Sequence, residues 1–232
     1  MLMQAGRHTH ESATVSDLHL YIGNKNYSSW SLRAWLALKQ TGAAFEETVI
    51  PLYRDDSTVM LAQYSPSGRV PVLQHGDRTV WESLAIGEYL AEQFRDAGLW
   101  PHEPYARAVA RAVSNEMHAG FAALRMHLPM DMRARRRQHA ADQAVTKDIR
   151  RIVDLWSDCR RRFGKGAPFL FGAYSLADAM YAPVVSRFIT YGIAVEGLAA
   201  EYLDAAWNWP ALQAWVHAAR VEPWTIELFD NR

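Results

Sequence analysis

The chain has 232 residues, enough for one large domain or two ordinary ones with a substantial core. Half of the residues are apolar and 22% are charged, which is typical of a soluble globular protein. Because 25 basic residues balance 25 acidic ones, no net charge recruits nucleic acid or an anionic membrane. No apolar run approaches the roughly 20 residues that a membrane-spanning helix needs.

The start of the chain and its cysteine content bear on the cellular compartment. Residues 1–16 are polar and lack an apolar core, so we expect a disordered lead and not a secretory signal. His8 and His10 lie in this lead, where two histidines make only a weak metal site, and we expect no bound metal. The single cysteine, Cys159, excludes an intrachain disulfide and suits a reducing cytoplasm.

The first strand and the first helix are predicted on either side of a serine-rich loop. Residues 18–22 are β-prone and end at Gly23, and apolar residues then recur at helical spacing until Gly42. Ser28 and Ser29 therefore lie where unpaired backbone N–H groups and the positive end of the helix dipole meet. A serine before a helix is most often only an N-cap, so a functional role needs support from other motifs.

The next elements complete the order β-α-β-α-β-β-α. Residues 45–50 are predicted to form a second strand and residues 55–64 a short helix. Residues 70–74 and 78–81 flank a glycine-containing turn and predict a hairpin, which a third helix follows. This order is that of a thioredoxin-like domain, a mixed sheet between helices.

The domain boundaries follow from a linker rich in proline and glycine. We place the thioredoxin-like domain at residues 17–95, the linker at 96–104 and an all-helical domain at 105–232. Ser175 and Asp178 form a predicted capping box within the helical domain. Its helices are predicted over about 105–128, over 130–163, from Ser175 through Phe188 with Pro183 inside, over 198–206 and over 210–220.

Two further motifs lie in the first domain. Pro71 cannot donate to a central ladder, so it belongs at the first residue of a strand, where a cis Val70-Pro71 bond fits. At the start of the third helix, Ser83 and backbone N–H groups can hold a carboxylate, and Glu82 can receive an ammonium. The head group of one amino acid carries both charges.

Taken in order, the serine loop, the Val70-Pro71 step, the Glu82-Ser83 pair and the capping box resemble the cytosolic glutathione S-transferases. The resemblance runs from the first strand over nearly the whole chain. It implies an α/β thioredoxin-like N-terminal domain followed by an all-α domain. In that family the backbone before the cis-proline pairs with the cysteinyl unit of glutathione, and the Glu/Gln-Ser pair binds its γ-glutamyl end. We extend the implied glutathione site to the neighbouring Arg69.

The serine loop itself is most similar to the Ser-Ser-Cys-Ser-x-Arg signature of the zeta class, the maleylacetoacetate isomerases. Trp30 stands where that signature has cysteine. The resemblance implies that Ser28 is the catalytic serine, with Ser29 as the alternative. It also implies that Arg33 is the helix arginine, which would orient the loop or tune the thiolate, although a plain surface arginine is an equal alternative.

One hydrogen bond from a serine is strong enough to activate the thiol of glutathione. The free thiol has a pKa of about 8.5, and lowering it by about two units requires roughly 2.7 kcal/mol. One hydrogen bond to a charged group contributes about 1.5–3 kcal/mol, so no general base is needed. Tyr21 and Tyr27 stay as competing donors, because other classes of the family use a tyrosine hydroxyl.

The electrophile is expected between the sheet domain and the first helix of the helical domain. Met117, Phe121 and Arg125 recur on one face of that helix, and Tyr27 directly precedes the serines. We predict that these four residues line the substrate pocket, although an apolar face is more often core. Arg125 points to an acidic or carbonyl-bearing substrate, so the expected partner is a small hydrophobic or carbonyl electrophile.

The favoured hypothesis is a glutathione-dependent transferase of the detoxification type, with glutathione as co-substrate, or a zeta-like isomerase. The alternative is a non-catalytic glutathione-binding or scaffold protein in which the serine is only a cap. By resemblance we expect a cytoplasmic homodimer. The basic run 133–137 has acidic neighbours and no interleaved aromatic residues, so we interpret it as a solvated helix face and expect no nucleic-acid or membrane partner.

Overall fold

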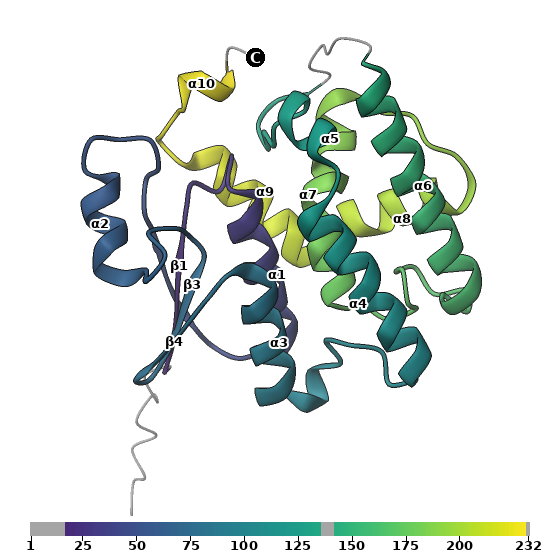
Figure 1. Cartoon of the computed structure of the whole chain (residues 1–232), viewed down its shortest axis with the longest axis horizontal. Helices are drawn as coiled ribbons and strands as arrows, with labels where there is room; N and C mark the ends of the chain where they lie inside the picture. Colours follow the sequence, from purple (N-terminus) through teal and green to yellow (C-terminus); the bar gives the residue numbers. More distant parts are fainter. Residues whose placement is uncertain (1–16, 136–141, 231–232) are drawn as a thin grey trace, which may run out of the picture.

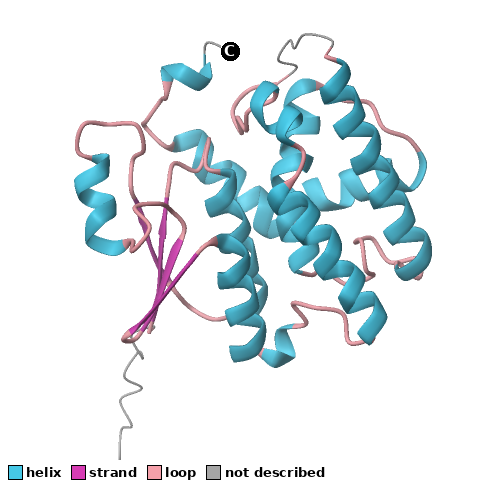
Figure 2. Ribbon diagram, in the orientation of Figure 1, coloured by secondary structure: helices cyan, strands magenta, loops and turns pink. Residues whose placement is uncertain are grey.

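The computed structural model describes residues 17–135 and 142–230. The lead at 1–16, predicted to be disordered, lies outside these residues, as do Arg136 and Arg137 of the basic run. The strands gather in one part of the molecule and a group of helices forms the other (Figure 2). No helix in the described ranges is long and apolar enough to cross a membrane.

The sheet has four strands in the order β2-β1-β3-β4. β1 pairs in parallel with β2 and antiparallel with β3, and β3 forms a hairpin with β4. Leu20 of β1 lies opposite Leu73 of β3, and both are fully buried on the face that packs against helices. The strands are β1 (Leu18–Ile22), β2 (Glu46–Val49), β3 (Val72–His75) and β4 (Arg78–Trp81).

Three helices flank this sheet and complete the predicted order. Helices α1 (Ser29–Thr41) and α3 (Ser83–Gln93) lie between the sheet and the helical part, and α2 (Ser57–Tyr64) lies on the other side (Figure 1). Helix α1 ends where Gly42 adopts the left-handed conformation, as a C-terminal glycine does. The Val70-Pro71 peptide bond before β3 is cis, as predicted.

The helical part is built around α7, which packs against α1, α4 and α8. All but one of its residues are buried, and Pro183 lies inside it as predicted. At its start Asp178 accepts a hydrogen bond from the Ser175 backbone N–H at 2.8 Å, which confirms the capping box. The elements are η1 (Arg95–Ala97), α4 (Pro104–Ala119), α5 (Ala122–His127), α6 (Gln143–Phe163), α7 (Leu176–Tyr191), α8 (Gly197–Trp207), α9 (Pro210–Val221) and α10 (Glu227–Asp230).

The prediction of one continuous helix over 105–128 is wrong, because the chain breaks after α4. A Cβ atom on Gly120 would lie 2.6 Å from the Glu116 carbonyl oxygen, so this backbone conformation requires glycine. The next residue, Phe121, has a φ of 54°, which turns the chain before α5 begins. Residues after this break therefore do not continue the helix face of the residues before it.

The prediction of a helix starting near Met130 is also wrong. Helix α6 begins only at Gln143, where the Asp142 carboxylate accepts hydrogen bonds from the backbone N–H groups of Ala144 and Val145. The described residues 130–135 are not helical, and Met130 lines the same cavity as Phe229 of α10. This stretch and α10 become walls of the candidate site.

Candidate active site

The serine loop is fixed by a short series of hydrogen bonds. Ser28 is the N-cap of α1, and its Oγ donates to Ser31 Oγ at 2.8 Å. Ser31 Oγ also accepts from the Gly23 backbone N–H at 3.0 Å. Ser28 is only 7% exposed, so its hydroxyl is held at the helix N-terminus. Ser31 had no predicted role, although its place three residues after the N-cap is where a capping contact forms.

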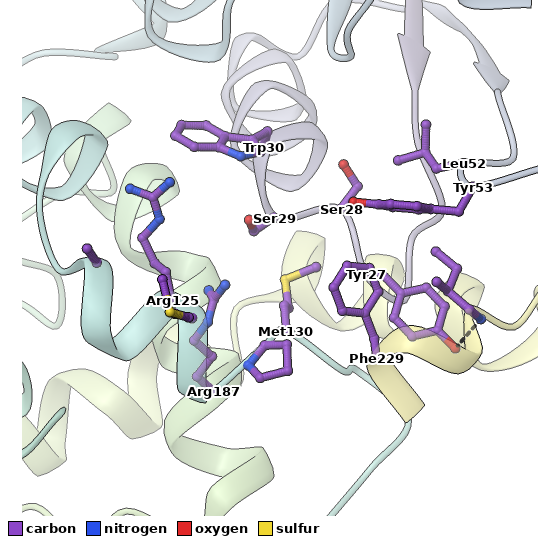
Figure 3. Close-up of a pocket in the computed structure, with 14 residues that line it drawn as sticks. Tyr27, Ser28, Ser29, Trp30, Leu52, Tyr53, Arg125, Met130, Arg187 and Phe229 are labelled. Atoms are coloured by element: carbon purple, nitrogen blue, oxygen red, sulfur yellow. Dashed lines mark hydrogen bonds between the residues drawn. The ribbon is translucent and has the colours of Figure 1, made fainter. Parts of the chain in front are cut away.

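Ser29 differs from Ser28 in its hydrogen bonding. It is half-buried, and its hydroxyl has no hydrogen-bond partner among the residues that the structure describes. Both serines line the same cavity, whose volume is about 470 Å³, within the range of small-molecule sites. The other lining residues are Tyr27, Trp30, Leu52, Tyr53, Ala122, Arg125, Met126, Pro129, Met130, Arg187, Ile226 and Phe229 (Figure 3).

The predicted substrate-pocket residues divide into two groups. Tyr27 and Arg125 line the cavity. Met117 and Phe121 do not, and the prediction that they do is wrong: they are 0% and 7% exposed and belong to the hydrophobic core. The physical reason is the break at Gly120, which separates these two apolar residues from the face that carries Arg125.

The two tyrosines that competed with serine as donors are both engaged elsewhere. The Tyr27 hydroxyl donates to Asp230 at 2.8 Å and accepts from the Ile226 backbone N–H, and burial together with Asp230 raises its pKa. The Tyr21 hydroxyl donates to Gln74 at 3.2 Å, in a separate part of the sheet domain. Burial raises the pKa of Tyr21 as well. Neither phenol is arranged to stabilise a thiolate in the cavity.

The residues predicted to bind glutathione are not among those that line the cavity. Ser83 is fully buried at the start of α3, and its Oγ donates to Glu82 at 3.4 Å. Glu82 has a φ of 77° and accepts from the Leu84 backbone N–H at 3.2 Å. Arg69 is exposed, and its backbone N–H donates to the Ser65 hydroxyl at 2.9 Å.

His118 connects these two regions and was not predicted. Its Nε2 lies 3.7 Å from a Glu82 carboxylate oxygen, and its ring meets the Trp30 indole edge-on with 5.2 Å between centroids. Its Nδ1 is buried and has no hydrogen-bond partner in the described part of the chain. The contact joins residues far apart in sequence, so no local pattern could have indicated it.

Arg33 and Arg125 pack against Trp30, and the charge of Arg187 acts on Arg33. Arg33 is 2% exposed, with its guanidinium carbon 4.4 Å from the indole centroid, and that of Arg125 lies 5.0 Å from it. Burial and the charges of Arg187 and Arg125 lower the pKa of Arg33 to about 9. Burial and then the charge of Arg125 lower the pKa of Arg187 to about 10. The prediction for Arg33 allowed an exposed position, whereas the residue is buried beside this cavity.

The chain after α9 closes the cavity opposite Trp30. The Glu222 carboxylate accepts from the backbone N–H groups of Lys25 at 2.7 Å and Asn26 at 3.2 Å, next to the serine loop. Arg133 donates to the carbonyl oxygens of Ala219 at 2.9 Å and of Glu222. The interpretation of Arg133 as part of a solvated helix face is therefore wrong, because it anchors this segment.

The α10 segment adds aromatic contacts to that wall. The Phe229 ring lies 5.8 Å from the Tyr27 ring and 5.4 Å from the Tyr53 ring, measured between centroids. Through these contacts Phe229 of α10 joins the cavity lining, near the loop that carries Ser28 (Figure 3). Helix α10 was not predicted, since a single helical turn has no periodicity to detect.

Cys159 is not available for thiol chemistry. It is buried in the core, and burial raises its pKa to about 12. Across residues 17–135 and 142–230, no group of three or more metal-ligating side chains is found. The serine loop and the arginines around Trp30 therefore carry the polar chemistry of the cavity.

The mixed four-stranded sheet with its cis-proline, joined to a helical domain across a serine-bearing cavity, defines a protein with a thioredoxin-like domain followed by a helical domain. Family models match both parts: glutathione S-transferase, N-terminal domain, at residues 27–93, and glutathione S-transferase, C-terminal domain, at residues 134–218. The chain belongs to the glutathione S-transferase family.

Individual relatives agree with this assignment at modest identity. Glutathione S-transferase F14 of Arabidopsis thaliana is 25% identical over 82% of this chain and 75% of its own length. A probable maleylacetoacetate isomerase of Caenorhabditis elegans is 34% identical, but over 44% of this chain and 47% of its own length. A solved glutathione transferase homolog from Burkholderia, with bound glutathione, is 27% identical with a TM-score of 0.65, covering 88% of this chain and 99% of that one.

Proposed function

We propose that this chain is a glutathione transferase that activates the thiol of glutathione with Ser28 and delivers the thiolate to an electrophile in the adjoining cavity. The observation that carries the proposal is the position of Ser28, buried at the N-terminus of α1 and lining the cavity of about 470 Å³. Glutathione would extend from this point along Val70 and Pro71 to Glu82 and Ser83.

The hydrogen bonds around Ser28 suit a thiolate donor. In the structure its hydroxyl donates to Ser31, whose Oγ already accepts from the Gly23 N–H. When a thiolate binds, the Ser28 proton turns toward the sulfur, and Ser31 can donate its own proton to Ser28 Oγ in return. Ser28 then keeps two hydrogen bonds, so stabilising the thiolate leaves no buried hydroxyl unsatisfied.

Ser29 is the alternative donor, and one observation favours it. Its hydroxyl has no partner within the described residues, so it could reach a sulfur without breaking an existing hydrogen bond. Arg33 supports either donor, because a positive charge near the sulfur favours the thiolate. Arg69 is assigned to glutathione binding as well, at the exposed side of the site.

The finer assignments are proposals by family likeness. We propose a cytoplasmic homodimer that acts in detoxification or in a zeta-like isomerisation. The C. elegans relative named a probable maleylacetoacetate isomerase supports the second option. Against it stands Trp30, where the zeta signature has cysteine. The competing function is a non-catalytic glutathione-binding scaffold, which is favoured by the fact that Ser28 already makes a capping contact with Ser31.

The experiment compares Ser28→Ala and Ser29→Ala in steady-state conjugation of glutathione to 1-chloro-2,4-dinitrobenzene. Loss of one hydrogen bond to a charged sulfur lowers kcat/KM by about 10- to 100-fold. We expect this loss in Ser28→Ala, with glutathione affinity within about threefold of wild type by calorimetry. No turnover above the uncatalysed rate in wild type would favour the scaffold. Equal turnover in all three proteins would remove both serines from catalysis, and a loss confined to Ser29→Ala would transfer the role to Ser29.

A further inference from the structure

The cavity lining is positively charged although the whole chain carries no net charge. The lining includes Arg125 and Arg187 and, across the ranges that the structure describes, no Asp or Glu. Figure 3 shows both arginines reaching from the helical part toward the loop that carries Ser28 and Ser29. The charge therefore faces the place where the electrophile must sit if Ser28 activates glutathione.

Each lining arginine is held in place by backbone oxygens. Arg125 donates through Nη1 to the carbonyl oxygens of His118 and Gly120, each at 3.3 Å, where α4 ends. Arg187 donates through Nε to Leu128 at 2.7 Å and through Nη1 to Pro183 at 2.9 Å. Carbonyl dipoles orient the guanidinium groups but do not neutralise them.

No carboxylate neutralises the group either. Within the described residues, none of the guanidinium groups of Arg33, Arg125 and Arg187 lies within 4.0 Å of an acidic side chain. Arg33 differs from the two lining arginines in its hydrogen bonding. It is 2% exposed, and its Nε and Nη1 have no hydrogen-bond partner in the described part of the chain. Glu82 acts on Arg33 only at longer range. Buried charges are ordinarily paired, so this arrangement is incomplete without an anion.

We propose that the end of the cavity between Trp30 and Met130 is a carboxylate subsite, in which Arg125 and Arg187 bind a carboxylate of the electrophile and Arg33 adds a third positive charge behind the Trp30 indole. Guanidinium groups are suited to this task because their planar donors match a carboxylate. The inference rests on the proposed function and narrows its substrate class to anionic electrophiles.

Trp30 is the residue on which two of these arginines pack. Trp30, which holds Arg33 and Arg125 by cation–π contact, is the position at which the sequence departs from the zeta signature. The γ-glutamyl end of glutathione is assigned to a different element from the two lining arginines. Glu82 and Ser83 lie at the start of α3, whereas Arg125 lies on α5 and Arg187 on α7.

The test measures binding of a matched pair of unreactive probes, 3,5-dinitrobenzoate and 3,5-dinitrobenzamide, by calorimetry. The two probes have nearly the same shape and differ in charge. We compare wild type, Arg125→Gln, Arg125→Lys and, as a control, Arg161→Gln, an exposed arginine on α6. Arg125→Gln is the informative variant, because it removes a hydrogen bond from a charged guanidinium group to the carboxylate of the benzoate.

We expect wild type and Arg161→Gln to bind the benzoate at least about tenfold more tightly than the benzamide. The preference should fall below about threefold in Arg125→Gln and recover in part in Arg125→Lys. Equal binding of the two probes to wild type overturns the proposal, whether or not a variant folds. If a folded Arg125→Gln keeps the wild-type preference for the benzoate over the benzamide, the assignment of Arg125 to the subsite is overturned. The assignment is also overturned if Arg125→Gln loses affinity for glutathione and keeps that preference.

A separate arm keeps this inference distinct from the proposed function. Wild type is assayed for conjugation of glutathione to 1-chloro-2,4-dinitrobenzene, which carries no carboxylate. In this step the sulfur–carbon bond forms, the carbon–chlorine bond breaks, chloride leaves with the electron pair and the thiol proton goes to solvent. Conjugation without a benzoate preference supports the transferase and overturns the subsite. A benzoate preference with neither conjugation nor a thiolate absorbance of bound glutathione supports the subsite and overturns the transferase.

Discussion

Replacing Glu222 with glutamine tests how the last segment of the chain supports the serine loop. The Glu222 side chain is 5% exposed, and its two oxygens accept from the backbone N–H groups of Lys25 and Asn26. Glutamine keeps the shape of the side chain but offers a single acceptor oxygen. One of the two N–H groups would therefore face an amide donor.

The expected cost can be estimated from these contacts. An unsatisfied buried donor costs about 1–3 kcal/mol, and the surviving hydrogen bond loses about 1 kcal/mol with its charge. Burial raises the pKa of Glu222, so removing the charge also recovers some desolvation energy. This recovered energy offsets part of the two costs. We therefore expect the free energy of unfolding to fall by about 2 kcal/mol, which is the lower end of the sum of those costs.

Urea unfolding at pH 7 measures this loss. Glu227→Gln is the matched control, because Glu227 lies in the same segment and is exposed, and a surface change of this kind is expected within about 0.5 kcal/mol of wild type. If Glu222→Gln also stays within about 0.5 kcal/mol, the two hydrogen bonds do not hold the segment to the loop, and the reasoning is refuted.

Two further predictions concern buried residues of the helical part. Met117→Ala should destabilise the protein by about 2–5 kcal/mol in urea unfolding, with KM for the electrophile within twofold, because Met117 is a fully buried core residue; a changed KM at unchanged stability would return it to the pocket. Burial raises the pKa of Asp178 from 3.8 to about 6, so between these values the folded chain keeps a proton that the unfolded chain has released. The stability of wild type relative to Asp178→Asn should therefore fall by up to about 3 kcal/mol from pH 4 to pH 7, and a constant or rising difference in urea unfolding would contradict this sign.

The sequence predicted the sheet domain well because its signals are local. β1 has the predicted bounds, residues 18–22, and Gly42 ends α1 in the left-handed conformation. The cis-proline and the capping box at Ser175 were also predicted from short motifs. Each of these features depends on the conformational preference of one or two residues and not on distant contacts.

The walls of the cavity could not be predicted in the same way. The break at Gly120 looks in sequence like a glycine tolerated within a helix, and only the contact with the Glu116 carbonyl shows that it ends one. Arg187 lies on a helix that is buried on all sides, so no amphipathic pattern marks its inward face. The anchoring of Glu222 to Lys25 joins residues nearly two hundred positions apart.

The central claim is that Ser28 stabilises the thiolate of bound glutathione, and its most direct test is the ultraviolet absorbance of that thiolate, titrated with pH in wild type, Ser28→Ala and Ser29→Ala. In wild type the thiol should titrate about two units below its free pKa of about 8.5. In Ser28→Ala the pKa should return toward 8.5, while Ser29→Ala should titrate like wild type. A thiol pKa that stays low in Ser28→Ala would contradict the account and leave Ser28 as a helix cap.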